Sequence, residues 1–430
     1  MGYLGFATAC GDVNGDGFAD VILGAYNAPQ GDNVAAGEVY LFTGRSLLLG
    51  ERNLAQANGV FQGKKAYDGA GYALAVGDLN GDGYGDLIIG APGANKSAGE
   101  VYVMMGNPAL LGVINLEVAS LTLQGIDKDD KAGVSLASGD VNQDDYADII
   151  IGASGANNGA GEVYVVFGGG ALSGRRSLSG ADVMFLGINQ GDGAGTAVAA
   201  GDVTGDGVAD VVIGAPYSNK EAGAVYVCIG KKNLIGTNNL SGIDMILEGK
   251  NAGDQTGFAL ACGDVNGDGY EDIVIGAPQA SPGNVTNAGE TYVVFGAKNL
   301  PNLKTLAFAD VSFQGINAGD QSGYAVCTAD LNHNRCKEVI IGAITAKRGD
   351  KEVGEIYFFH GSPSLHGFND LTFSYLHFKG KVEGCEAGCS VAGGDINRDG
   401  FEDVIIGACK MPEGDLIEAG EAYIVFGLGL

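Results

Sequence analysis

The sequence predicts an all-β protein, a seven-bladed β-propeller whose blades are four-stranded antiparallel sheets. Two observations lead to this fold class. An acidic nine-residue loop recurs seven times at steps of 62 to 66 residues, beginning at Asp12, Asp78, Asp140, Asp202, Asp264, Asp330 and Asp395. Glycine occupies 76 of the 430 positions, which is typical of turn-rich β proteins rather than helical ones. A supersecondary unit copied at a nearly fixed period indicates a repeat architecture that can use the whole chain as one domain.

The second repeat shows the strands expected in each unit. Residues 71–77 alternate small and larger side chains, which suits an inner strand at a crowded axis. After the acidic loop, residues 86–92 form a short apolar run that predicts a strand buried on both faces. Residues 99–106 alternate and are rich in β-branched and aromatic side chains, and residues 121–125 form the fourth strand. No segment of the unit has the period of a long amphipathic helix.

Four short strands in sevenfold repetition favour a propeller, because radial repetition removes exposed sheet edges. A linear β-solenoid is the alternative, but its repeats are shorter. The predicted domain is residues 1–430, with blades at about 1–63, 64–125, 126–187, 188–249, 250–315, 316–380 and 381–430. The fourth-strand motif occurs six times, at Phe61, Leu123, Phe185, Leu247, Phe313 and Phe378. We therefore expect that the outer strand of blade seven is missing from this chain, that the chain begins inside the first strand of blade one, and that it is part of a longer protein.

The acidic loop carries the oxygen atoms that Ca²⁺ prefers. In the first copy, DVNGDGFAD at residues 12–20, carboxylates stand at positions 1, 5 and 9 and an amide at position 3. These carboxylates repel one another unless a cation lies among them, and a hard divalent ion fits them best. Glycine at position 6 allows a sharp turn, and position 7 would supply a backbone carbonyl.

Position 12 of the loop distinguishes it from an EF-hand, which needs a bidentate Glu there and a helix on either side. All seven copies have an aliphatic residue at that position, from Leu23 to Ile406, so the carboxylate at position 9 must close the loop. The predicted metal ligands are Asp12, Asn14, Asp16, Phe18 and Asp20; Asp78, Asn80, Asp82, Tyr84 and Asp86; Asp140, Asn142, Asp144, Tyr146 and Asp148; Asp202, Thr204, Asp206, Val208 and Asp210; Asp264, Asn266, Asp268, Tyr270 and Asp272; and Asp395, Asn397, Asp399, Phe401 and Asp403.

The seven copies are not equivalent. In the third, Asp145 replaces the glycine, and in the fourth, Thr204 offers a weaker hydroxyl oxygen. The sixth copy, DLNHNRCKE at residues 330–338, lacks both the position-5 Asp and the glycine, and its Arg335 and Lys337 oppose a cation. We expect this loop to be empty or weak, which leaves about six Ca²⁺ ions.

Two simpler interpretations remain open. The loops could be Asx-rich turns that hold no ion, although six near-intact copies make that interpretation difficult. Alternatively, bound ions could be purely structural. We favour a structural role, because every ligand belongs to its own blade and no open coordination position is evident.

The composition excludes several classes of function. A net charge of −28 argues against nucleic acid and anionic membranes as partners. The sequence contains no run of eighteen apolar residues, so we expect no direct membrane insertion. Residues 1–6 have no signal-peptide pattern. No nucleophile elbow, phosphate loop or carboxylate pair stands outside the acidic loops, so we expect no catalytic or cofactor-binding residues and no enzyme activity.

The eight cysteines give no disulfide framework. Cys10, Cys228, Cys262 and Cys327 fall on predicted strands, where buried free thiols are expected. Whether Cys385, Cys389 or Cys409 form a disulfide stays open, because only their proximity in sequence supports it.

With these features assembled, the sequence resembles the FG-GAP repeat family, best known from the propeller of integrin α subunits. Its motif words stand at residues 90–92, 214–216 and 276–278 as Gly-Ala-Pro, with variants at 152–154 and 407–409. The resemblance covers essentially the whole chain. It implies Ca²⁺ in the strand 1–2 hairpins on one face and ligand binding by the 2–3 and 4–1 loops on the other. Those 2–3 loops would be residues 26–35, 92–98, 216–222, 278–287 and 344–353.

We therefore expect an extracellular or cell-surface recognition propeller that binds a protein or glycan. Two alternatives are the accessory propeller of a secreted enzyme, such as a GPI-specific phospholipase D-like protein, and a lectin. The tripeptide Arg348-Gly349-Asp350 lies in a predicted 2–3 loop, where it could present an integrin-binding sequence. Chance explains it better in a chain this rich in Gly and Asp.

Overall fold

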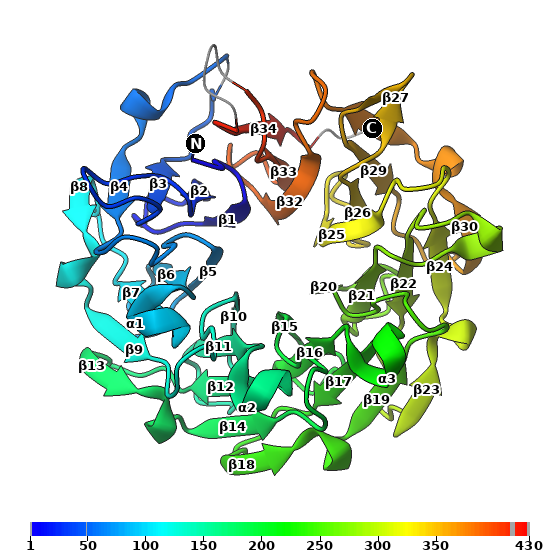
Figure 1. The fold of residues 1–430 in the computed structure, drawn as a ribbon, viewed down its shortest axis with the longest axis horizontal. Helices are drawn as coiled ribbons and strands as arrows, with labels where there is room; N and C mark the ends of the chain where they lie inside the picture. Colours follow the sequence, from blue (N-terminus) through cyan, green and yellow to red (C-terminus); the bar gives the residue numbers. More distant parts are fainter. Residues whose placement is uncertain (1, 49, 413–417, 428–430) are drawn as a thin grey trace.

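The computed structural model describes residues 2–48, 50–412 and 418–427, and it confirms the predicted propeller. Seven antiparallel sheets stand in a ring, and the first strand of each sheet faces the centre (Figure 1). In the described residues, no helix is long and apolar enough to span a bilayer.

The sheets have the following strands. Blade one contains β1 (Ala7–Gly11), β2 (Asp20–Ala25), β3 (Glu38–Phe42) and β4 (Gly59–Gln62). Blade two contains β5 (Ala73–Gly77), β6 (Asp86–Ala91), β7 (Glu100–Met104) and β9 (Leu121–Gln124). Blade three contains β10 (Ser135–Gly139), β11 (Asp148–Ala153), β12 (Glu162–Val166) and β14 (Val183–Leu186). Blade four contains β15 (Ala197–Gly201), β16 (Asp210–Ala215), β17 (Ala224–Cys228) and β19 (Met245–Glu248). Blade five contains β20 (Ala259–Gly263), β21 (Asp272–Ala277), β22 (Glu290–Val294) and β24 (Val311–Gln314). Blade six contains β25 (Ser322–Ala329), β26 (Glu338–Ala343), β29 (Glu355–Phe359) and β31 (Leu376–Lys379). Blade seven contains β32 (Ala387–Gly394), β33 (Asp403–Ala408) and β34 (Glu421–Val425).

Blades one to five each gain a fifth strand that the sequence pattern did not predict. These cap strands are β8 (Gly112–Asn115), β13 (Gly174–Ser177), β18 (Gly236–Asn239), β23 (Leu303–Thr305) and β30 (Gly367–Asp370). Each comes from the strand 3–4 connection of the following blade and pairs in parallel with strand four of the preceding blade. They are short and mostly exposed, so they lack the apolar alternation that identifies a half-buried strand.

Short helical turns complete the loops. A 3₁₀ turn follows each cap strand: η2 (Leu116–Val118), η3 (Leu178–Gly180), η4 (Leu240–Gly242), η6 (Leu306–Phe308) and η7 (Leu371–Phe373). Two others are η1 (Leu54–Gln56) and η5 (Pro282–Asn284). The 2–3 loops of blades two to four contain α1 (Ala94–Ser97), α2 (Ala156–Gly159) and α3 (Ser218–Glu221), and that of blade six contains the hairpin β27 (Lys347–Arg348) and β28 (Lys351–Glu352).

Small residues on strand one allow seven inner strands to meet around the axis. A β-carbon on Gly11 would lie 2.6 Å from Cγ1 of Val76, and one on Gly77 would lie 2.0 Å from Oγ of Ser138. Both distances are too short for non-bonded atoms, so a larger residue at the last position of these strands would force the neighbouring side chain to move. The predicted crowding of the inner strand is therefore explained by contact with the neighbouring blade.

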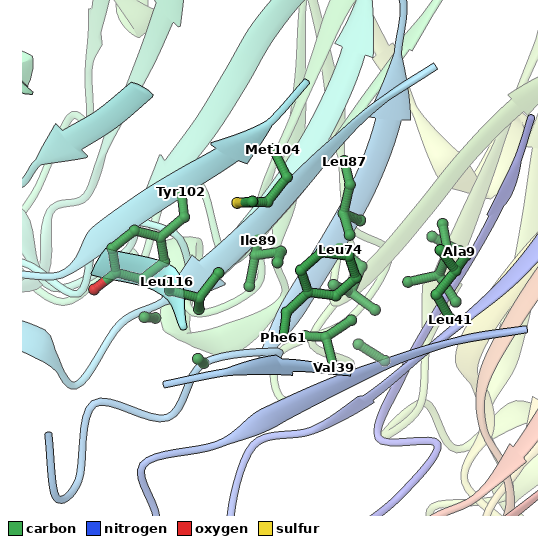
Figure 2. Close-up of a cluster of buried hydrophobic side chains, with 14 of the residues drawn as sticks. Ala9, Val39, Leu41, Phe61, Leu74, Leu87, Ile89, Tyr102, Met104 and Leu116 are labelled. Atoms are coloured by element: carbon green, nitrogen blue, oxygen red, sulfur yellow. The ribbon is translucent and has the colours of Figure 1, made fainter. Parts of the chain in front are cut away.

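The hydrophobic cores lie between adjacent blades. Strand two is buried at every residue in all seven blades, as its continuous apolar run predicts. Between blades one and two, Phe61 and Leu116 pack in one cluster with Ile89 and Tyr102 (Figure 2). Because each core needs side chains from two blades, a single repeat could not bury its apolar surface alone.

Blades seven and one join as the other blades do. Leu4 forms a parallel bridge with Gly420, and its amide donates to the carbonyl of Ala419 at 3.1 Å. Equivalent bridges join Gly99 to Ala132 between blades two and three and Gly161 to Ala194 between blades three and four. Since this contact precedes β1, the expectation that the chain begins inside the first strand is wrong. Among the described residues, the sheet of blade seven has three strands, so its outer strand is missing there as predicted.

Candidate functional site

All seven acidic loops connect strand one to strand two, so the topology places them on one face of the ring, the loop face. The position-9 residue of each loop is also the first residue of strand two, as Asp20 is of β2 and Asp86 is of β6. The predicted ligand positions therefore recur in the same local structure in every blade.

The position-1 carboxylate organises the turn. In the first loop, Oδ1 of Asp12 accepts from the amides of Gly15 at 2.6 Å and Asp16 at 3.2 Å, and Oδ2 accepts from Gly17 at 2.7 Å. The bonds from positions 5 and 6 to the position-1 carboxylate recur in all seven loops. Gly17 has a φ of 82°, and Asp145 at the same place in the third loop has 69°. The Asp replacement thus adopts the left-handed conformation that the turn requires, at a steric cost that glycine does not have.

The position-9 carboxylate is completely buried in the six intact loops. Its two oxygens accept from the position-2 amide and from a glycine amide just after strand three, at 2.8 to 3.0 Å. Burial raises the pKa of Asp20, Asp86 and Asp403 to about 6 and that of Asp148, Asp210 and Asp272 to about 7, while these hydrogen bonds act in the opposite direction. A buried negative charge at neutral pH therefore lacks enough compensation from the protein alone.

Position 3 gives independent evidence that the loops suit a cation. In the third and fourth loops, Oδ1 of Asn142 and Oγ1 of Thr204 are buried and have no hydrogen-bond partner in the described structure. Unpartnered buried oxygens are costly and unusual. Both atoms are ones that the sequence assigned to Ca²⁺, and an ion would satisfy them.

Side chains alone do not form a ready-made metal cluster. Within the described ranges, no three His, Cys, Asp or Glu side chains come together as a group that could hold a metal ion. The predicted donor set differs from such a cluster, because it includes an amide or hydroxyl oxygen at position 3 and a backbone carbonyl at position 7. These oxygen donors fit a hard divalent cation better than a transition metal.

The sixth loop is built differently. Oε1 of Glu338 accepts from Nδ2 of Asn332 at 2.5 Å and lies 3.3 Å from Nδ1 of His360. The His360 ring is stacked on Tyr375, with centroids 3.7 Å apart. Lys337 forms an ion pair with Glu402 of the next loop at 3.2 Å. The His360 imidazole therefore lies beside the position-9 carboxylate, although nothing in the sequence of the loop itself predicts it there. Only the packing of strand three against strand two brings it there.

The seven loops are linked head to tail. In every blade the position-8 amide donates to the position-1 carbonyl of the preceding loop, as in Gly85 to Asp12 at 2.8 Å and Ala19 to Asp395 at 3.1 Å. The position-7 ring also covers the preceding loop, since a β-carbon on Gly15 would lie 2.2 Å from Cε1 of Tyr84. The loop face is therefore a closed ring of contacts.

The opposite face, the 2–3 loop face, carries an aromatic cluster beside the first residues of the inner strands, and we call this cluster the aromatic mouth. Tyr3, Phe6, Tyr26 and Tyr72 form successive ring pairs with centroids 4.5 to 5.4 Å apart. Tyr324 packs in one cluster with Tyr3 and Phe6. All five side chains are half-buried. Sequence reasoning missed this cluster, although aromatic residues directly after the glycine that precedes strand one were its visible signal.

The tripeptide at residues 348–350 lies on the 2–3 loop face, between strands two and three of blade six. Arg348, Gly349 and Asp350 are exposed, and the register of β27 and β28 places Gly349 and Asp350 in the two-residue turn of their hairpin. All eight cysteines are described and none forms a disulfide. Cys385 donates to the carbonyl of Val353 at 3.0 Å, and the Cys409 amide donates to Sγ of Cys389 at 3.2 Å.

A seven-bladed sheet ring with an acidic strand 1–2 loop in each blade defines a class of repeat propellers. The family model described as FG-GAP repeat matches residues 4–42, 70–104, 132–166, 194–228 and 256–294. The chain therefore contains FG-GAP repeats, and its propeller is similar to that of integrin α chains, as the sequence motifs indicated.

Curated relatives agree with this assignment. Integrin alpha pat-2 of Caenorhabditis briggsae is 31% identical over 302 residues, which cover 65% of this chain and 24% of that protein. Phosphatidylinositol-glycan-specific phospholipase D of Dictyostelium discoideum is 28% identical over 240 residues, covering 49% of this chain and 25% of that protein. The human enzyme of that name is 32% identical over 181 residues, covering 40% and 21%. The chain thus spans about a quarter or less of these relatives.

Proposed function

We propose that this chain is a Ca²⁺-stabilised recognition propeller, extracellular or on the cell surface, that binds a protein or glycan through its 2–3 loop face. The observation that carries the proposal is the division between the two faces. One face repeats a loop with a buried, under-compensated carboxylate, and the other presents half-buried aromatic side chains. Amphipathic aromatic side chains are enriched where proteins bind partners.

The ions would be held by the side chains at positions 1, 3, 5 and 9 and by the position-7 carbonyl of the six intact loops. Bound Ca²⁺ would neutralise the position-9 carboxylate and fix the hairpin between strands one and two. Extracellular Ca²⁺ is in the range where loops of moderate affinity are filled. The similarity to integrin α chains and to phospholipase D enzymes supports a location outside the cell.

Calorimetric titration of EDTA-stripped protein tests the metal. We expect about six sites, and Asp82→Ala should remove one of them because position 5 is lost from the second loop. Asp129→Ala is the matched control, because Asp129 is an exposed aspartate that belongs to none of the seven acidic loops. Binding of fewer than two ions, or an equal loss in both variants, would reject the calcium interpretation.

Binding of the labelled protein to glycan arrays and to cell-surface protein fractions tests the recognition face. Tyr72→Ala and Tyr324→Ala should weaken any specific binding at least tenfold while Ca²⁺ stoichiometry stays unchanged. Phe308→Ala is the control, since that ring is 75% exposed on the outer rim. Equal effects of rim and mouth variants would locate the binding surface elsewhere.

The second candidate is the accessory propeller of a secreted enzyme, favoured by the phospholipase D relatives. In that case the mouth variants should leave glycan and cell-surface binding unchanged. The propeller should instead bind a purified catalytic domain of that enzyme class in a pull-down with Ca²⁺.

A further inference from the structure

An exposed asparagine at the outer edge of the ring stands in the sequence pattern for N-linked glycosylation. Residues 239–241 read Asn-Leu-Ser, and two further Asn-x-Ser/Thr tripeptides begin at Asn95 and Asn284. A glycan is bulky and needs a surface position in a secreted chain. The three sites can therefore be compared by what each asparagine side chain contacts.

Asn239 forms a closed side-chain turn with Ser241. It is the last residue of β18, which lies on the outside of the ring (Figure 1). Its Oδ1 accepts from the Ser241 amide at 2.9 Å and from the Ser241 hydroxyl at 2.7 Å. Both residues are exposed, and within the described ranges Nδ2 of Asn239 makes no hydrogen bond. The turn therefore uses the amide oxygen and leaves unpaired the nitrogen that would carry a sugar.

Asn95 begins the same kind of tripeptide, but its amide nitrogen is engaged. Nδ2 of Asn95 donates to Oε1 of Glu100 at 2.7 Å, and Glu100 is only 2% exposed. The same carboxylate accepts from Lys64 at 2.6 Å and from Gln124 at 3.0 Å. A sugar on this nitrogen would disturb a buried network, so we expect Asn95 to stay unmodified in the folded chain.

Asn284 is exposed, but its tripeptide does not form the turn seen at Asn239. In the part of the chain that the structure describes, the Thr286 hydroxyl makes no hydrogen bond to the Asn284 side chain. Asn284 also lies in the 2–3 loop of blade five, where a glycan would stand on the proposed recognition face. The segment before Asn239 is on the opposite side, because the Gly230 amide donates to Asp210 of an acidic loop at 2.8 Å.

A cavity beside Asn239 can receive the first sugar. Its volume is about 400 Å³, and its lining includes Asn239 itself, polar Thr237, Asn238 and Asp244, and apolar Ile235. Cavities of about 300 to 1,000 Å³ hold small ligands. The polar side chains can bond to sugar hydroxyls, and Ile235, which is 69% exposed, can pack against the apolar face of a sugar ring.

We propose that Asn239 carries an N-linked glycan when a eukaryotic cell secretes this chain, and that the first sugar lies in the adjacent cavity. The inference rests on the extracellular location proposed above. The donor is an oligosaccharide joined to a lipid diphosphate. A bond forms between Nδ2 and the anomeric carbon of the donor, the bond from that carbon to the diphosphate oxygen breaks, and Nδ2 loses one proton. The glycan stands on the loop face and leaves the 2–3 loop face open.

Blade two offers a matched position that lacks only the hydroxyl. Asn115 is the last residue of β8, and its Oδ1 accepts from the Glu117 amide at 2.8 Å, as that of Asn239 does from Ser241. Residues 115–117 read Asn-Leu-Glu, so the two tripeptides differ only in their third residue. Glu117→Ser should therefore create a second glycan site.

Secretion of the 430-residue chain from cultured animal cells behind an added signal peptide tests the site. Glycopeptide mapping of the folded, secreted protein should find a glycan on Asn239 and none on Asn95. Asn239→Gln and Ser241→Ala should each remove one glycan from the intact mass, Ser241→Thr should keep it, and Glu117→Ser should add one. Amide hydrogen exchange in residues 235–244 should become faster after enzymatic removal of the glycan, because the cavity is then vacated.

Three results would overturn the glycan site: secreted protein without a glycan on Asn239, equal modification of Asn95 and Asn239, or no added glycan in Glu117→Ser. Unchanged hydrogen exchange after glycan removal would overturn the placement of the sugar in the cavity. Because the added signal peptide imposes the secretory route, these outcomes test the site and not the extracellular location. Fractionation of the source cells tests that location separately.

Discussion

Metal-free protein should lose stability as the pH rises from about 5 to about 8, because of the position-9 carboxyls. In the folded chain the pKa of Asp148 is about 7, against an ordinary value of 3.8. The folded state therefore keeps a proton that the unfolded state releases between about pH 4 and pH 7. Stability from this group is fully present below pH 4 and is lost as the pH rises through 7.

The size of the effect follows from the shift. A rise from 3.8 to about 7 is roughly 3 pH units, and about 1.36 kcal/mol per unit gives about 4 kcal/mol for one loop. Even a third of this value, summed over six loops, is about 8 kcal/mol. That sum is comparable with the total stability of a typical domain, about 5 to 15 kcal/mol. A divalent cation among the carboxylates would remove most of this cost.

Thermal melts at pH 5, 6, 7 and 8, in EDTA and in millimolar Ca²⁺, measure the effect. In EDTA the melting temperature should fall steadily across this range, whereas in Ca²⁺ it should stay level or rise. The gap between the two series should therefore widen with pH. A melting temperature in EDTA that rises from pH 5 to pH 8, or two series that coincide at pH 8, would refute the reasoning. Mg²⁺ serves as the control cation, because it is smaller and demands stricter octahedral geometry.

Three further predictions concern single sites. In chemical denaturation, Gly24→Ala should lower the free energy of unfolding by about 1 to 3 kcal/mol, because the added β-carbon would lie 2.1 Å from the carbonyl oxygen of Gly71. The control variant Gly170→Ala should change this free energy little, because no atom lies within 4 Å of the added β-carbon. Asn334→Asp combined with Arg335→Gly should add one Ca²⁺ to the calorimetric stoichiometry, and an unchanged count would show that another feature disables the sixth loop. Tyr102→Phe should cost about 1 to 2 kcal/mol, since its hydroxyl donates to buried Glu100, whereas Tyr226→Phe should cost less because Ala224 replaces the glutamate.

The elements that the sequence predicts well are those whose side chains face a core. The apolar run that begins at Asp86 is buried on both faces because blades pack on either side of it. The cap strands escaped prediction because their pairing depends on the preceding blade rather than on their own pattern. Arg175 and Arg176 of β13, for example, are exposed, and no alternation marks them as a strand.

The candidate site divides in the same way. The turn geometry of the acidic loops could be predicted from local spacing, because its hydrogen bonds join residues within one loop. The contact between Glu338 and His360 could not, because 22 residues separate them and two strands must pair before they meet. The aromatic mouth likewise requires the ring to close, since Tyr3 and Tyr324 come from blades far apart in sequence.

The head-to-tail links between the loops explain how the sixth loop can diverge without opening the ring. Each link joins a backbone amide to a backbone carbonyl, so it does not depend on the acidic side chains. Lys337 still donates through its amide to the carbonyl of Asp264 at 2.8 Å, and Glu402 donates to that of Asp330 at 3.0 Å. Loss of one acidic loop therefore removes the local charges but keeps the geometry of its neighbours. A face held in this way tolerates sequence change in single loops, and the rigid ring then supports variable loops on the opposite face.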